Sequence, residues 1–160
     1  MVNACINLIN YTVSILCFLS IYWVHKFLIE GSTDTIIIAA FGAAAVLSFS
    51  NNTIKYSYTQ ILLAATISAA IGVYGNELNQ SLLIKVIFVI SSSVLIMNLM
   101  NISYPPAGAI AIIPLLSNAN IHDLGYLYVF YPTATGLTII YSFTIIKEKL
   151  SWQVKKRLKS

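Results

Sequence analysis

The chain has 160 residues, of which 58% are hydrophobic and only 9% are charged, and its mean hydropathy is +0.82. These values lie outside the range of soluble domains of this length, so composition predicts an integral membrane protein. The net charge of +4 is concentrated near the C-terminus and does not describe the chain as a whole.

The first apolar segment covers residues 8–29 and is long enough to cross a hydrocarbon core, which needs about 20 residues. It lacks a basic region before it and a small-residue cleavage site after it, so it is predicted to be a retained span and not a signal peptide. Cys5 and Cys17 are too few for a disulfide framework and have no metal-ligand spacing, so we predict neither a metal site nor a cofactor.

The second and third segments carry small residues that suit close helix packing. The second begins after Asp34, covers residues 35–50, and is short for a span. Its centre, residues 39–45, is almost entirely Ala and Gly around Phe41. The third segment covers residues 60–74 and repeats small residues at helical spacing. Such faces let another helix backbone approach closely inside a membrane.

The remaining three segments are separated by polar turns and by a proline pair. The fourth covers residues 81–100 and contains Lys85. The fifth starts at Pro105-Pro106, where a helix cannot continue but a new one can begin. The sixth covers residues 125–147, and Pro132 and Gly136 are predicted to kink it.

A short internal similarity relates the second and fifth segments. Gly42 and Asn52 are as far apart as Gly108 and Asn118, with small and branched apolar residues between them. Each short segment also lies between two longer ones. This pattern predicts a two-fold repeat of three segments, residues 8–75 and 81–147, as in transporters whose site lies where the halves meet.

The predicted fold is therefore an all-α membrane domain, residues 1–147, of about six membrane-embedded helices, followed by a basic tail, residues 148–160. Six of the nine basic residues lie at or near this tail, namely Lys147, Lys149, Lys155, Lys156, Arg157 and Lys159. Because they follow a span directly, we interpret them as a cytoplasmic anchor on anionic lipid and not as a nucleic-acid site. Charge in the loops favours six crossings, while four crossings with two re-entrant short segments is the alternative.

Two motifs resemble a known family. Residues 40–49, Ala-Phe-Gly-Ala-Ala-Ala-Val-Leu-Ser-Phe, are similar to its Ser-Phe-Gly-Ala-Ser-Ala signature, and residues 104–109, Tyr-Pro-Pro-Ala-Gly-Ala, are similar to its His-Pro-Pro-Ala-Gly-Ala motif. Leu124-Gly125 with Pro132 and Gly136 matches its last span. The chain is thus identified as a member of the HPP family of integral membrane proteins. The resemblance implies a small helical protein suspected of transport, with some relatives linked to nitrite movement.

The chain departs from the family pattern in positions that carry charge. Tyr104 stands where the family has His, and Asn101 stands where an Arg is usual. We therefore expect an anion to be attracted chiefly by backbone N–H groups at the starts of the two short helices, near Gly42 and Gly108.

Two functions of different class follow from the sequence. The first is a transporter or channel for a small anion such as nitrite or nitrate, and the alternative is a non-transporting anchor or sensor that acts through a protein partner. No acid, base or nucleophile constellation indicates an enzyme. Small-residue faces in a small chain predict a homo-oligomer. The residues predicted to bind the anion are Phe41, Gly42, Ala43, Lys85, Ser92, Tyr104, Pro105, Pro106, Ala107 and Gly108.

Overall fold

The computed structural model describes residues 2–28, 35–50, 56–117 and 119–157, and all regular structure in these ranges is helical. The helices are α1 (Val2–Leu28), α2 (Thr35–Phe49), α3 (Tyr58–Glu77), α4 (Leu82–Leu99), α5 (Pro106–Leu116), α6 (Ala119–Leu124), the π-helical turn η1 (Val129–Ala134) and α7 (Thr135–Arg157). The loops at residues 29–34 and 51–55, whose charges favoured six crossings, lie outside the described residues.

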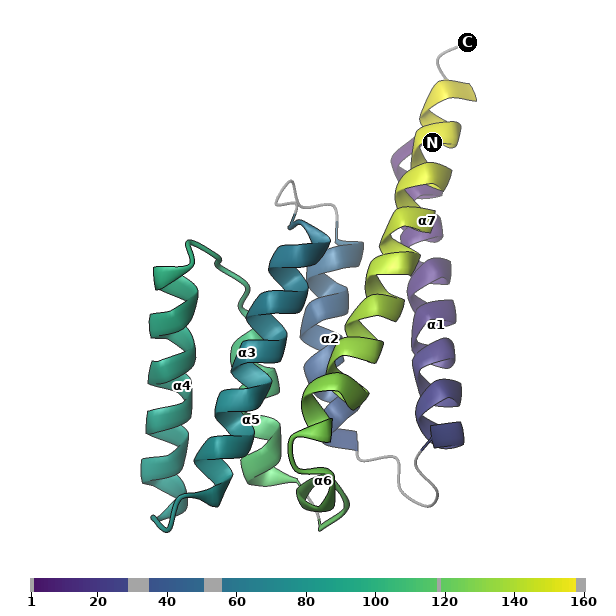
Figure 1. The fold of residues 1–160 in the computed structure, drawn as a ribbon. Coiled ribbons are helices and arrows are strands. Elements are labelled where there is room, and N and C mark those ends of the chain that lie inside the picture. The colour runs from purple at the N-terminus through teal and green to yellow at the C-terminus, as the bar shows by residue number, and fades with distance from the viewer. Residues whose placement is uncertain (1, 29–34, 51–55, 118, 158–160) are drawn as a thin grey trace.

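The chain reverses direction at each successive long segment, as Figure 1 shows. The N-terminal end of α1, the end of α2, the α4–α5 loop and the C-terminal end of α7 lie together, and we name this the tail end. The opposite end, which carries the α3–α4 turn and α6, is the α6 end. Helices α2 and α5 each run from one end toward the other, which agrees with six predicted segments and not with re-entrant turns.

Four helical segments are long and apolar enough to cross a membrane: those at residues 4–24, 58–77, 82–99 and 129–157. Helices α2 and α5 have only 15 and 11 residues. At about 1.5 Å per residue, α5 extends about 16 Å and is shorter than a hydrocarbon core of about 30 Å. Most of its side chains are buried between neighbouring helices, so protein and not lipid surrounds its ends.

The last predicted segment, residues 125–147, is not a single kinked helix, because it contains η1 followed by α7. Tyr131 has extended backbone angles (φ −138°, ψ 121°) just before Pro132, so the kink predicted at Pro132 is confirmed. Gly136 is not a kink, since it lies inside α7. Residues 119–124, expected as a loop, form α6. Helix α7 continues without interruption to Arg157, so the described part of the predicted basic tail extends a membrane helix.

Close packing of α3 on α5 forms the centre of the bundle. Small side chains of α3 are buried along one face, namely Ala64, Ala65, Ser68, Ala69 and Gly72. A Cβ atom placed on Gly72 would lie 3.0 Å from the carbonyl carbon of Ala111 and closer still to its oxygen. The α5 backbone therefore rests directly on Gly72, as the small-residue pattern of this segment predicts.

Gly42 and Gly108, which lie in the two short helices, do not make close contacts with another helix. A Cβ atom on either glycine would meet no heavy atom within 4 Å beyond its own helix and chain neighbours. The glycines that do permit contact are Gly72, Gly75 against Val89, and Gly136 against the Phe41 ring. Composition could not separate Gly72 from Gly42, because both lie in apolar helical stretches.

A proline inside α5 leaves one carbonyl without its helical partner, and a distant tyrosine supplies the missing donor. Pro114 has no N–H, so the carbonyl of Ile110 cannot accept the usual bond from four residues later. The Tyr128 hydroxyl, buried to 1% exposure, donates to this carbonyl at 2.9 Å. This bond joins α5 to the segment before η1 without adding a charge to the interior.

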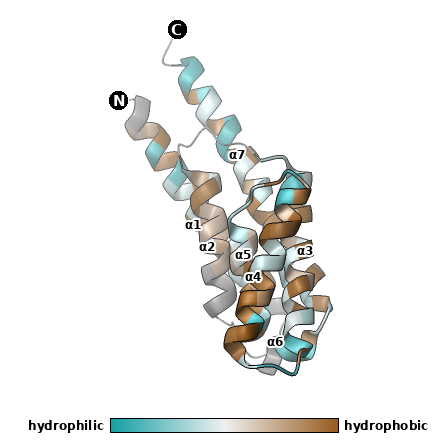
Figure 2. Ribbon diagram, turned by 90° about the vertical axis from the view of Figure 1, so that its left-hand side faces the viewer, coloured by the Kyte–Doolittle hydropathy of each residue, from teal (hydrophilic) through white to brown (hydrophobic). Residues whose placement is uncertain are grey.

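Outside this core, the lipid-facing surface is strongly apolar. Helix α4 presents an apolar surface in Figure 2, while hydrophilic colour gathers at α6 and the C-terminal end of α7. The side chains of Leu83 and Leu99 are 70% and 73% exposed. Such a surface is stable only against lipid or another apolar surface, so the structure is that of an integral multi-pass membrane protein.

We predict that Gly72→Ala destabilises the bundle whereas Gly42→Ala does not. The first change drives a methyl group into the α5 backbone, and overpacking of this kind costs about 1–3 kcal/mol. The second adds a methyl group in open space within a helix and is expected to stabilise it by about 0.5–1 kcal/mol. Thermal unfolding of both variants in detergent measures the difference, and equal melting temperatures would contradict the α3–α5 contact.

We also predict that Tyr128→Phe costs about 1–3 kcal/mol, because it leaves the buried Ile110 carbonyl without a donor. The cost should shrink in a Pro114→Ala background, where the restored N–H at position 114 can serve the same carbonyl. Tyr126→Phe, at an exposed neighbouring position, is the control. A double-mutant cycle on unfolding free energies measures the coupling, and additive effects would show that the two positions are independent.

Candidate functional site

The end of α4 positions the proline motif through a left-handed residue. Asn101 has φ +53°, a conformation that Asn adopts more readily than other side-chain-bearing residues. Its N–H donates to the Asn98 carbonyl at 3.1 Å, and the Ile102 N–H donates to the Met97 carbonyl at 2.9 Å. These two bonds form a Schellman motif, which ends α4 and turns the chain toward Tyr104. Asn101, at the position of the family's Arg, thus has a backbone role.

The start of α5 is buried but offers fewer donors than expected. Pro105 and Pro106 have no N–H groups, and the N–H groups of Ala107 and Gly108 donate to the carbonyls of Tyr104 and Pro105 at 3.0 and 3.1 Å. The expectation that this turn holds an anion on unpaired N–H groups is therefore wrong. Ala107 is buried, but its backbone is already paired.

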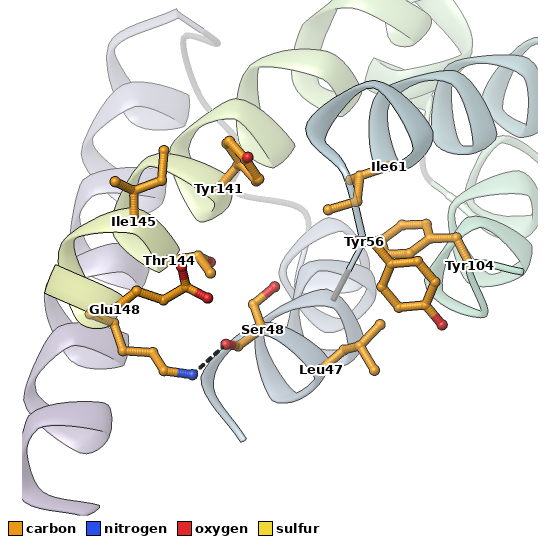
Figure 3. A pocket seen from close by; sticks show the side chains of 10 residues that line it. Leu47, Ser48, Tyr56, Ile61, Tyr104, Tyr141, Thr144, Ile145 and Glu148 are labelled. Atoms are coloured by element: carbon orange, nitrogen blue, oxygen red, sulfur yellow. Dashed lines mark hydrogen bonds between the residues drawn. The ribbon is translucent and has the colours of Figure 1, made fainter. Parts of the chain in front are cut away.

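A pocket of about 160 Å³ lies beside Tyr104 at the tail end of the bundle. Its polar wall is made by side chains with hydroxyl or charged groups, namely Ser48, Tyr56, Tyr104, Tyr141, Thr144, Lys147 and Glu148. In Figure 3 the labelled members of this set come from the end of α2, the segment before α3, the α4–α5 loop and α7. A volume of this size holds a small ion with a few waters, since one water takes about 30 Å³ of liquid.

Aromatic contacts form the inner wall of this pocket. The Tyr104 side chain is only 2% exposed, and its ring packs edge-on against Tyr56 with centroids 5.5 Å apart. Near the start of α3, the Tyr58 hydroxyl lies 2.9 Å from the Thr138 hydroxyl, and its ring is 4.9 Å from that of Tyr141. These contacts fix α3 against α7 next to the pocket.

Lys147 supplies the positive charge of the pocket. Its Nζ donates to the carbonyls of Ser48 and Ser50 at 2.8 and 3.2 Å, so it caps the C-terminal end of α2. The dashed line in Figure 3 marks the contact with Ser48. A cation is favoured at a helix C-terminus, where carbonyls lack helical partners. Glu148 also lines the pocket, so a negative charge stands beside this ammonium.

Lys85, the intramembrane cation of the sequence prediction, lies at the other end of the bundle. Its Nζ donates to the Asn76 carbonyl at 2.7 Å, near the end of α3 at the α6 end. The Asn76 side chain in turn lies 2.7 Å from Nδ1 of His122 on α6. Lys85 therefore caps α3 and does not line the pocket beside Tyr104.

The α2 residues predicted for the site do not line the pocket beside Tyr104. Helix α2 begins at Thr35, so Gly42 is in its interior and the expected helix start at Gly42 is wrong. Phe41 is buried against Gly136, and Ala43 is exposed. Gly42 lines a second pocket, between α1 and α2.

In the serine run of α4, the buried member is not the predicted one. Ser92 is partly exposed, whereas the neighbouring Ser93 is 1% exposed and its hydroxyl has no partner among the described residues. Neither serine lines the pocket beside Tyr104.

Sequence reasoning thus found Tyr104 but missed most of the residues that surround it. Lys147 was placed in the anchor, because it ends the sixth apolar segment, and its contact with α2 is distant in sequence. Tyr56 follows a polar loop and gave no signal of burial. Within the described ranges, no group of three or more His, Cys, Asp or Glu residues is arranged to hold a metal ion.

Comparison with known proteins gives one match. A family model described as HPP, transmembrane region, matches residues 2–157. No curated protein and no solved structure matches the chain.

We predict that Asn101→Val destabilises the protein by about 1–2 kcal/mol, the cost of a left-handed conformation for an ordinary L residue. Asn101→Gly should retain stability, because Gly adopts this conformation freely. Asn98→Val, three residues earlier on an exposed helical position, is the matched control. Unfolding midpoints in detergent compare the three variants, and equal midpoints for the Val and Gly variants at position 101 would contradict the assigned turn.

Proposed function

We propose that this chain, which belongs to the HPP transmembrane-region family, is a membrane transporter or channel for a small anion of about the size of nitrite or nitrate. The observation that supports the proposal is the pocket beside Tyr104, which combines a lysine with several hydroxyl groups at one end of a membrane bundle. A protein that served only as an anchor would have no need of a polar pocket behind an interrupted helix.

The attraction for the anion comes from Lys147 in this proposal. An anion about 4 Å from an ammonium gains about 4 kcal/mol at the effective dielectric constant of a protein surface. A helix start contributes only about 0.3–2 kcal/mol, and here its first N–H groups are paired. A hydroxyl donor from Tyr141 would add to the coordination, since hydroxyl groups donate to anions without being charged. Thr144 would not donate to the anion, because its hydroxyl already donates to the Ile140 carbonyl at 2.8 Å.

Glu148 limits how tightly the pocket would hold an anion. Its carboxylate lines the same wall as the Lys147 ammonium, and in Figure 3 it reaches from α7 toward the end of α2. A like charge near the anion offsets part of the attraction of the lysine. Weak binding suits transport, because the ion must leave as readily as it enters.

The arrangement of the chain supports transport between two faces. Helices α1 to α3 form one half of the chain and helices α4 to α7 form the other, and each half has a short helix, α2 or α5, between longer ones. The first half starts at the tail end and the second half starts at the α6 end. This is the arrangement expected of an inverted repeat in a transporter. The basic residues of α7 would place the tail end, and with it the pocket, at the cytoplasmic face. A homo-oligomer would cover part of the exposed apolar surface of α4.

Uptake of nitrite and nitrate into proteoliposomes tests the proposal. We predict that Lys147→Gln lowers the initial rate at low anion concentration by about tenfold, the effect of about 1.4 kcal/mol in binding. Lys147→Arg should retain most of the rate because it keeps the charge. Lys149→Gln, two residues along the same helix and outside the pocket, is the matched control, and Lys85→Ala should also leave the rate unchanged.

Each variant is compared with the wild-type protein for folding in detergent, since Lys147 also caps α2. Equal rates for Lys147→Gln and Lys149→Gln would remove Lys147 from the path. If the folded wild-type protein moves no anion, the transporter proposal fails. The chain would then be better explained as a membrane anchor or sensor that acts through a protein partner.

A further inference from the structure

A second pocket, between α1 and α2, is separate from the one beside Tyr104. It encloses about 410 Å³ and is bordered on α1 by Asn10, Ser14 and Phe18, which lie four residues apart on one face. On α2 it is bordered by Gly42, Ala45, Val46, Phe49 and Ser50, also on one face. Two helical stripes that face each other across empty space form a groove along both helices.

The groove is polar at one end and apolar at the other. Helix α1 starts at the tail end and α2 finishes there, so Asn10, Ser14 and Ser50 lie toward the tail end. Phe18 and Gly42 lie toward the middle of the bundle. From residue 10 to residue 18 the groove extends about 12 Å, close to the half-thickness of a hydrocarbon core of about 30 Å. Its length and polarity match one lipid chain below its ester group in a single leaflet.

Positive charge lies next to the polar end of the groove. The carbonyl of Ser50, which borders the groove, accepts a hydrogen bond from the Lys147 ammonium. Helix α7 packs along α1 and continues past the end of α2 with exposed Lys149, Lys155 and Lys156. Lys156 also lies over the Trp152 ring, 5.3 Å from its centroid, and Trp is typical of the membrane interface.

We propose that the groove between α1 and α2 binds one acyl chain of an anionic phospholipid, whose phosphate group contacts Lys149, Lys155 and Lys156 of α7. Cations near a membrane surface attract anionic headgroups, which explains the preference for a charged lipid over a neutral one. A helix of a second copy would leave the positive charge at the polar end of the groove without an anionic partner, which favours the lipid as the occupant. This inference does not depend on whether the protein transports an anion.

Gly42 provides the test, because its missing side chain keeps the groove open. A Cβ atom at Gly42 would meet no heavy atom within 4 Å beyond its own helix and chain neighbours, so Gly42→Leu can fill the groove without a clash at the backbone. Gly108→Leu is the matched control, since Gly108 is equally open and does not border the groove. Ser14→Leu fills the groove from α1 and serves if the Gly42 variant does not fold.

The experiment measures binding of phosphatidylglycerol, and of phosphatidylcholine with the same acyl chains, to the purified full-length protein in detergent. The wild-type protein should bind phosphatidylglycerol more tightly. Gly42→Leu should weaken this binding by about tenfold, the effect of losing contact with about two methylene groups, while Gly108→Leu binds as the wild type does. Replacement of Lys149, Lys155 and Lys156 by Gln should reduce phosphatidylglycerol binding to the level of phosphatidylcholine.

Three results would overturn the inference. The first is unchanged phosphatidylglycerol binding in both Gly42→Leu and Ser14→Leu, which would show that the groove holds no lipid. The second is a preference for phosphatidylglycerol that survives the triple lysine replacement. The third is a change from oligomer to monomer in Gly42→Leu with lipid binding intact, which would make the groove a contact between copies of the chain.

Discussion

Backbone carbonyls that the helices cannot pair for themselves are the constraint on which this bundle depends. In hydrocarbon an unpaired carbonyl costs several kcal/mol, and short or proline-containing helices create such groups inside the membrane. At three places in the structure, a side chain from another segment donates a hydrogen bond to such carbonyls. Lys147 serves the end of α2, Lys85 serves the end of α3, and Tyr128 serves the carbonyl that Pro114 leaves in α5.

This use of side chains explains how a chain with few charges can keep lysines near its apolar segments. Lys85 and Lys147 each place an ammonium at the C-terminal end of another helix, where the partial charge is negative. The two contacts lie at opposite ends of the bundle and so fasten it on both sides. The lysine of the pocket is thus also a structural residue, so its effect on anion uptake can be separated from its effect on the bundle only when folding is measured on the same variant.

Much of the fold followed from the sequence because helical spans leave strong local signals. The apolar segments, the two short helices, the end of α4 near the proline motif and the kink at Pro132 all depend on residues close together in the chain. Tyr104 was found for the same reason, since the proline pair marks its position. What could not be predicted depends on contacts between distant segments, such as Lys147 with the end of α2. Likewise, the sequence contains glycines in several apolar stretches, but only the folded chain decides that Gly72 and not Gly42 meets another backbone.

Helix α7 gives this protein a mechanical property. It is one continuous helix from Thr135 to Arg157, and Thr144 and Lys147 on its middle turns line the pocket beside Tyr104. Its last nine residues extend about 14 Å beyond the pocket. A continuous helix resists bending, so a sideways force on this extension would be carried as a lever to the pocket wall and to the end of α2. We therefore expect a displacement of this extension to shift Thr144 and Lys147 in the pocket wall with it.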